Sequence, residues 1–178
     1  MQETAQQYIQ RILGHIEGKD ALTVQKGSAA RMKKAIQGLT PKQMRWKPEP
    51  AKWSIAEILA HLADGEIVAG WRLRSVVGQN GVTIQAYDQN AWAAVFDYGK
   101  RDAKLSLETF RVLRDNNLAM LKALPREAWE NHGMHQERGK ETVAHLVRMF
   151  AGHDTNHVLQ IEGIVALIKG KSKKKRKK

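Results

Sequence analysis

The chain has 178 residues, of which 42% are hydrophobic and 27% are charged, a length and composition that fit one globular domain. It contains no cysteine, which excludes disulfides, thiolate metal ligands and a cysteine nucleophile. No stretch reaches the roughly 18–20 apolar residues that span a membrane, and the first ten residues lack the basic and apolar regions of a secretion signal. We therefore expect a cytoplasmic protein with no membrane span.

The net charge of +12 is concentrated at the end of the chain. Residues 169–178 hold eight basic residues and no acidic ones, so the other 168 residues carry 22 basic and 18 acidic residues, a net charge of +4. A run of like charges without apolar residues gains too little burial to offset its ordering entropy. We expect residues 1–168 to form the folded domain and residues 169–178 to form a disordered Lys/Arg-rich tail. Such a tail either only adds solubility or attracts phosphate backbones and anionic membranes without specificity, so no specific nucleic-acid partner is expected.

Helical spacing of apolar residues recurs along the chain, and alternating runs long enough for a typical strand are absent. The pattern predicts a short polar-faced helix and then four long helices, over residues 4–17, 21–38, 55–77, 107–124 and 141–168. Thr40 and Pro41 predict the start of a single helical turn. Ser54 and Glu57 have the spacing of a capping box that begins the second long helix. The predicted fold class is all-α, a four-helix bundle with short extra helices in the connections.

Two of the seven histidines, His153 and His157, lie four residues apart in the last predicted helix, which places them on one face. That face also carries apolar residues, so both imidazoles should point into the bundle, where each needs a polar partner. A divalent metal ion would satisfy both. His61, in the middle of the second long helix, is either a third ligand of the same ion or a core histidine bonded to a backbone carbonyl or to Asp64.

Polar residues near these histidines supply further candidates. Asp64 either orients a ligand imidazole or takes a proton, or else is a solvated carboxylate. Gln160 continues the face of the paired histidines and is positioned to hydrogen-bond a substrate. Asp154 either supports a histidine from across the bundle or is exposed. Arg72 and Arg74 either bind an anionic cosubstrate or are surface charges.

Other polar positions are given a simpler interpretation. His15, His132 and His135 lie in polar segments and are expected to be solvated. The connection over residues 79–104 is long for a compact domain. Its stretch over residues 86–93 is a candidate lid for the site, although packing alone would also account for its aromatic residues.

Four segments together resemble one family. They are KPEPAKWSIAEILAHLADGE (47–66), AYDQNAWA (86–93), LSLETFRVLRDNN (105–117) and AGHDTNHVLQIEGI (151–164). With these segments the chain, from about residue 20 to residue 168, resembles the DinB-like superfamily of four-helix-bundle metalloproteins, which includes thiol-dependent S-transferases. The resemblance implies an up-up-down-down bundle, a homodimer, and a zinc or nickel ion held by His61, His153 and His157.

A divalent cation held by three neutral imidazoles keeps an open position at which water or a thiol is activated. Because the chain has no cysteine, a thiol must come from a low-molecular-weight cosubstrate. We therefore predict a metal-dependent enzyme that transfers such a thiol to a small electrophilic substrate, or hydrolyses it, with Asp64 and Gln160 as catalytic residues. One alternative is a metal-stabilised small-molecule-binding protein without turnover. Another is a nucleic-acid or membrane accessory that acts through the tail.

Overall fold

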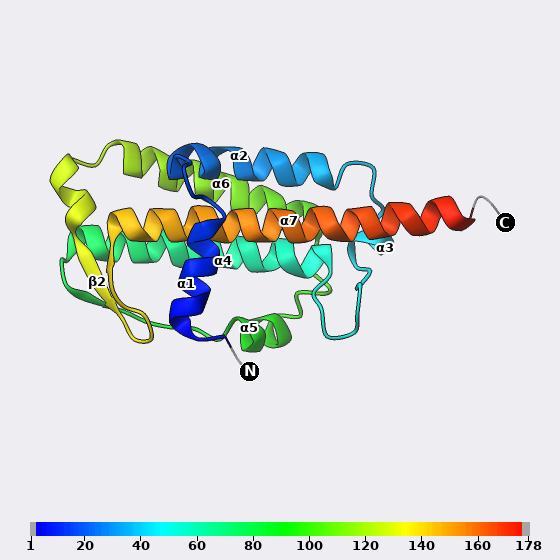
Figure 1. Ribbon diagram of the computed structural model, residues 1–178, viewed down its shortest axis with the longest axis horizontal. Helices are drawn as coiled ribbons and strands as arrows, with labels where there is room; N and C mark the ends of the chain where they lie inside the picture. The colour runs from blue at the N-terminus through cyan, green and yellow to red at the C-terminus, as the bar shows by residue number, and fades with distance from the viewer. Residues whose placement is uncertain (1–2, 176–178) are drawn as a thin grey trace.

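The computed structural model of the protein contains four long helices that lie side by side along its longest axis (Figure 1). They are α2 (Ala21–Ala35), α4 (Ile55–Gly78), α6 (Ala103–Lys122) and α7 (Val143–Lys175). The structure describes residues 3–175, with side chains through residue 171. None of the helices in this part of the chain is long and apolar enough to cross a bilayer. The predicted all-α four-helix bundle is confirmed.

The long helices form two parallel pairs. Gln25 Nε2 donates to the carbonyl of Val147 at 2.7 Å, and farther along both helices Arg31 donates to Glu162 at 2.8 Å, so α2 and α7 run the same way. Helices α4 and α6 run together in the opposite direction (Figure 1). In chain order, α2 runs up, α4 and α6 run down, and α7 runs up. The bundle thus has the two parallel helix pairs of an up-up-down-down bundle, although the helices follow one another in a different order along the chain. Because α4 and α6 are parallel, the connection between them must return along the bundle, which explains its length.

The helix starts follow the capping chemistry of the sequence. The hydroxyl of Ser54 accepts from the backbone N–H of Glu57 at 3.3 Å, and the Glu57 carboxylate accepts from the N–H of Ser54 at 2.8 Å. Thr40 caps α3 (Pro41–Met44), which has proline at its first position. Asp102 caps α6 by accepting from the N–H of Leu105, so that helix begins four residues before the start that apolar spacing predicted. Both capping predictions are confirmed.

Small elements fill the connections. They are α1 (Ala5–Gly14), α5 (Gln89–Val95), a 3-10 turn (Arg126–Glu130), and the strands β1 (Val82–Ile84), β2 (His132–His135) and β3 (Gly139–Thr142). Strand β2 lies between the other two, parallel to β1 and antiparallel to β3. The sheet is a correction to the sequence analysis, which expected no strands. Strands of three or four residues are too short to show the period-2 pattern, and β1 pairs with a segment about fifty residues away.

Helix α1 crosses α7 (Figure 1), where it contacts Gly152 and Asn156, the residues directly before His153 and His157. A Cβ added at Gly152 would lie 2.2 Å from the carbonyl oxygen of Ile12, so only glycine allows this approach. Arg11 Nη1 also donates to Asn156 Oδ1 at 3.0 Å. The crossing therefore fixes α1 over the middle of the bundle.

Helix α7 extends beyond the end that the sequence predicts. It continues to Lys175, so residues 169–175 of the expected disordered tail are helical, and residues 176–178 lie outside the described part of the chain. Lysine is a good helix former, and extending a packed helix requires no new nucleation. Lys171 Nζ also lies 4.1 Å from the ring centre of Trp46, a cation–π contact.

Candidate metal centre

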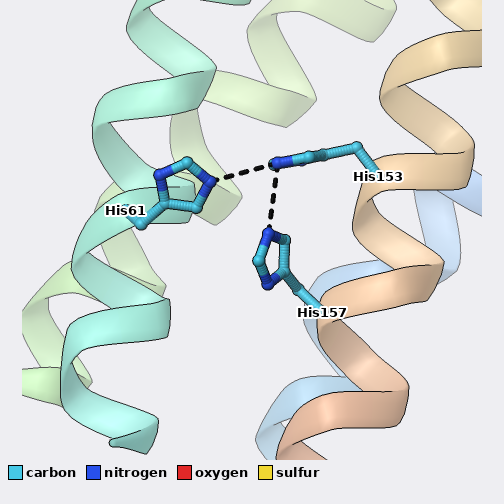
Figure 2. A group of neighbouring side chains, drawn as sticks. All are labelled: His61, His153 and His157. Carbon is cyan, nitrogen blue, oxygen red and sulfur yellow. Dashed lines mark hydrogen bonds between the residues drawn. The ribbon is translucent and has the colours of Figure 1, made fainter. Parts of the chain in front are cut away.

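Three histidine side chains meet between α4 and α7 (Figure 2). The Nε2 atom of His153 lies 3.1 Å from Nε2 of His61 and 3.2 Å from Nε2 of His157. These three residues are the group in the described chain whose potential ligand atoms all lie within 4.8 Å of one another. The structure thus brings together the three histidines that the sequence singled out as metal ligands.

Burial and helix packing explain where each histidine ring points. His61 is 1% exposed and lies among the apolar residues of α4, with Ile58 and Leu62 at 0% and 2%. His153 and His157 project from successive turns of α7 toward α4. His157 is buried, whereas His153 is partly exposed. The packing of α7 against α4 places these rings opposite His61.

Burial keeps these imidazoles neutral. It lowers the pKa of His61 to about 3, with a contribution from His157. Burial likewise lowers the pKa of His157 to about 4, and that of His153 falls well below its usual range. All three are therefore neutral at pH 7, which is the form of histidine that binds a metal ion.

The donor set fits a divalent cation. Tetrahedral coordination with metal–nitrogen distances of 2.0–2.1 Å would separate the nitrogens by about 3.3 Å, close to the two Nε2 separations in the structure. Three neutral imidazoles also cannot satisfy one another, because each ring nitrogen is either a donor or an acceptor and only some of the facing pairs can match. A cation at the centre would satisfy all three lone pairs at once, and imidazole ligands suit zinc and nickel.

The side chain of Gln160 contacts the ring of His157. Its side-chain oxygen lies 3.0 Å from Nδ1 of His157. An amide oxygen accepts, so this bond places the ring proton on Nδ1 and leaves Nε2 with its lone pair directed at the other histidines. The structure shows how Gln160 can orient a ligand; its predicted contact with substrate remains a prediction.

Asp64 is tied to a different part of the fold. Its carboxylate accepts a hydrogen bond from the hydroxyl of Tyr98 at 2.8 Å and from Nη1 of Arg101 at 2.8 Å. Burial and the neighbouring carboxylate raise the pKa of Tyr98 above its usual range. In the described structure Asp64 makes no hydrogen bond to a histidine, so its contacts anchor the segment after α5 to α4.

A buried ionic cluster that the sequence analysis did not foresee lies next to His153. Arg114, on α6, donates to Glu66 Oε1 at 2.9 Å and Oε2 at 2.6 Å, and it also binds both carboxylate oxygens of Asp154. Asn117 Nδ2 donates to Glu66 at 2.8 Å. The side chains of Arg114, Glu66 and Asp154 are 3%, 3% and 1% exposed. The cluster joins α4, α6 and α7, and its member Asp154 directly follows His153 in the chain. In the sequence, the members of the cluster are recognisable as charged residues within apolar helix faces.

A cavity of about 560 Å³ reaches His153. Apolar side chains from three of the long helices line part of it, and α1 and residues 86–90 line another side; among the lining residues are Leu62, Phe110, Leu146, Met149, Phe150, Tyr8, Tyr87 and Asp88. Trp92 does not line it and instead packs on the ring of Tyr87, with centroids 4.6 Å apart. The predicted lid segment thus contributes its first residues to the cavity wall, and α1, which was not predicted to take part, contributes as well.

The prediction that His135 is solvated is wrong. His135 is 3% exposed and lines the same cavity. It is buried because β2 pairs with β1 on one side and β3 on the other, which turns a polar segment of sequence toward the interior.

These features define a helical-bundle protein with a candidate three-histidine metal centre. The sequence model of the DinB superfamily matches residues 26–161, so this chain belongs to the DinB superfamily. A protein of Oceanobacillus iheyensis with the provisional name metal-dependent hydrolase OB0782 is 23% identical over 133 residues, which cover 75% of this chain and 77% of that protein. YfiT of Bacillus subtilis, provisionally named in the same way, is 23% identical over 134 residues, which cover 74% and 75%. A solved structure of YfiT, described as a probable metal-dependent hydrolase with an unusual four-helix bundle topology, superimposes with a TM-score of 0.78 at 20% identity, over 83% of this chain and 85% of that one.

Proposed function

We propose that this protein is a metal-dependent enzyme that acts on a small molecule bound in the cavity beside His153. The observation that carries the proposal is the convergence of three neutral imidazole nitrogens from α4 and α7. The names of the similar proteins, which describe metal-dependent hydrolases, support the same class of activity. A divalent cation, zinc or nickel, would supply Lewis acidity there, which polarises a substrate oxygen and lowers the pKa of water or of a thiol.

The residues of this chain have distinct parts in the proposed activity. His61, His153 and His157 would hold the cation, and Gln160 would fix the tautomer of His157. Helix α1 and residues 86–90 line one side of the cavity, where they would contact a bound substrate. Asp64, held by Tyr98 and Arg101, positions the segment that follows α5, and its catalytic role stays a prediction.

The nucleophile is water in a hydrolase and a low-molecular-weight thiol in a transferase. Water agrees with the names of the similar proteins; a thiol would have to be a cosubstrate, because the chain has no cysteine. Incubation of the metal-loaded protein with small esters, amides and alkylating electrophiles, each with and without added thiol, separates the two. Product formed without thiol supports hydrolysis, and product formed only with thiol supports transfer.

Elemental analysis of protein purified without a histidine tag tests the metal centre. We expect about one zinc or nickel ion per chain in the wild-type protein and little metal in His153→Ala. His145→Ala is the matched control, because His145 also lies on α7 but is not one of the three clustered histidines. Wild-type protein without metal, or a His153→Ala variant that retains it, would refute the proposal.

Metal that binds and stabilises the fold, with no turnover in any of these assays, would instead support the binding-protein alternative. The homodimer stays a prediction, which light scattering of the purified protein tests. The cytoplasmic location also stays a prediction, which cell fractionation tests.

A further inference from the structure

The cavity beside His153 also contains a buried cation without a carboxylate partner. Arg72, on α4, is 8% exposed and lines this cavity. Its one hydrogen bond within the described chain runs from Nη2 to the carbonyl oxygen of Gln85 at 2.7 Å. No carboxylate of the described residues forms an ion pair with it, and Glu141 is paired with Arg138 instead. Burial, followed by the charge of Arg138, lowers the pKa of Arg72. A buried, unneutralised guanidinium costs stability, so its retention calls for an explanation in terms of binding.

A second hydrogen-bond donor lies near this arginine. Nδ1 of His135 accepts from the backbone N–H of Glu137 at 3.1 Å, which places the ring proton on Nε2. Nε2 is buried and has no hydrogen-bond partner in the described structure. Burial, then Arg138 and to a smaller extent Arg72, lower the pKa of His135 to about 4. His135 is therefore a neutral donor without an acceptor at pH 7.

Two tyrosine hydroxyls extend this set of donors. Tyr8 and Tyr87 line the cavity, and within the described chain neither hydroxyl forms a hydrogen bond. The guanidinium carbon of Arg72 lies 5.8 Å from the ring centre of Tyr87. Burial raises the pKa of both tyrosines, so both keep their protons at neutral pH.

The carboxylates that line the cavity are largely engaged elsewhere. Glu3 is held by Arg11, Asp88 accepts from the backbone at the start of α5, and Arg114 binds Glu66 and Asp154. Glu137 is exposed to solvent. The polar groups of the cavity that lack a partner are therefore mostly hydrogen-bond donors, and they surround one positive charge without a counter-ion. Such a group of donors favours the binding of an anionic acceptor.

We propose that the part of the cavity around Arg72 and His135 binds a carboxylate group of the substrate. A guanidinium pairs with a planar carboxylate through two parallel hydrogen bonds, and one uncompensated charge balances a monoanion better than a phosphate dianion. Arg72 lies eleven residues beyond His61, about three turns along the same face of α4. The substrate would then be a carboxylic acid held at one end by Arg72, with its reacting bond at the other end near His153.

This orientation rests on the proposed metal-dependent function, whereas binding of the carboxylate itself does not require the metal. Benzoate is a suitable probe, because the cavity also offers apolar side chains such as Phe110 and Phe150. Benzamide is its neutral counterpart of similar shape, and inorganic phosphate is the competing anion. Binding of the three probes to the full-length protein is measured by calorimetry and by the NMR signals of the His135 ring.

We expect benzoate to shift the His135 signals and to bind at least about 10-fold more tightly than benzamide or phosphate. Arg72→Gln should weaken benzoate binding by about 10-fold or more, and Arg72→Lys should weaken it less because the charge remains. Arg74→Gln is the matched control, two residues along α4, where the arginine binds Asn116 and Asn117 instead. It should bind benzoate like the wild type.

The result that overturns the proposal is equal binding of benzoate and benzamide by the wild-type protein, which needs no variant and so does not depend on how Arg72→Gln folds. Tighter binding of phosphate than of benzoate would also overturn it. Benzoate binding that is lost in His153→Ala but kept in Arg72→Gln would place the anion at the histidines instead. If the wild-type protein takes up no zinc or nickel but binds benzoate through Arg72, the carboxylate site stands and the proposed metal-dependent function is refuted.

Discussion

Replacement of Arg114 by methionine tests the buried ionic cluster beside the candidate metal centre. The substitution keeps most of the apolar stem but removes the guanidinium that binds both Glu66 and Asp154. Two carboxylates, at 3% and 1% exposure, would then lie buried without a cation. Removing one partner of a buried pair costs about 3–5 kcal/mol of unfolding free energy, and we expect the upper end of this range because two carboxylates lose their partner.

Urea denaturation of wild type and variant at neutral pH, followed by circular dichroism, measures this loss of unfolding free energy. Arg111→Met is the control on the same helix, because Arg111 pairs with Glu108 and Asp115 at the surface and should contribute less than about 1 kcal/mol. If Arg114→Met costs less than about 1 kcal/mol, the cluster does not stabilise the bundle as described.

Three further predictions concern the site and its surroundings. Gln160→Leu should lower metal affinity by about 10–100-fold in chelator competition, with little change in thermal stability; unchanged affinity would mean that Gln160 does not orient His157. The metal-free protein should lose stability in urea as the pH falls from about 6.5 toward the folded-state pKa values, about 3 for His61 and about 4 for His157. The unfolded chain takes up these protons more readily, by up to about 1.4 kcal/mol per pH unit for each histidine, and a flat pH profile would contradict the burial of neutral imidazoles. Gly152→Ala should cost about 1–3 kcal/mol, because its Cβ would lie 2.2 Å from a carbonyl oxygen of α1. Gly163→Ala, with open space around the added Cβ, should instead stabilise the helix by up to about 1 kcal/mol in thermal unfolding.

Some features of this protein follow from residues that are close together in the sequence. Ser54 and Glu57 predicted the start of α4 correctly, because a capping box is complete within four residues. The shared face of His153 and His157 was equally predictable, since it follows from helical periodicity alone. Neither observation required knowledge of any other part of the chain.

Other features depend on contacts between segments far apart. The partners of Asp64 come from residues more than thirty positions away, so the sequence left its role open between a ligand support and a solvated carboxylate. Met134 is the one apolar residue within two positions of His135, which does not predict burial. His135 is buried because strands from two connections pair there. Arg72 had an anionic ligand or a surface position as its alternatives, and its burial beside His135 favours the first.

By itself the sequence determined the helices, their caps and the apolar faces that must pack together, because these follow from the chemistry of residues within one or two turns. Tertiary structure decided that His61 meets the two histidines of α7, that α1 crosses at Gly152, and that the bundle encloses a cavity with unpaired donors. The physical reason is that helix pairing depends on the burial of whole faces, for which many arrangements have similar local patterns.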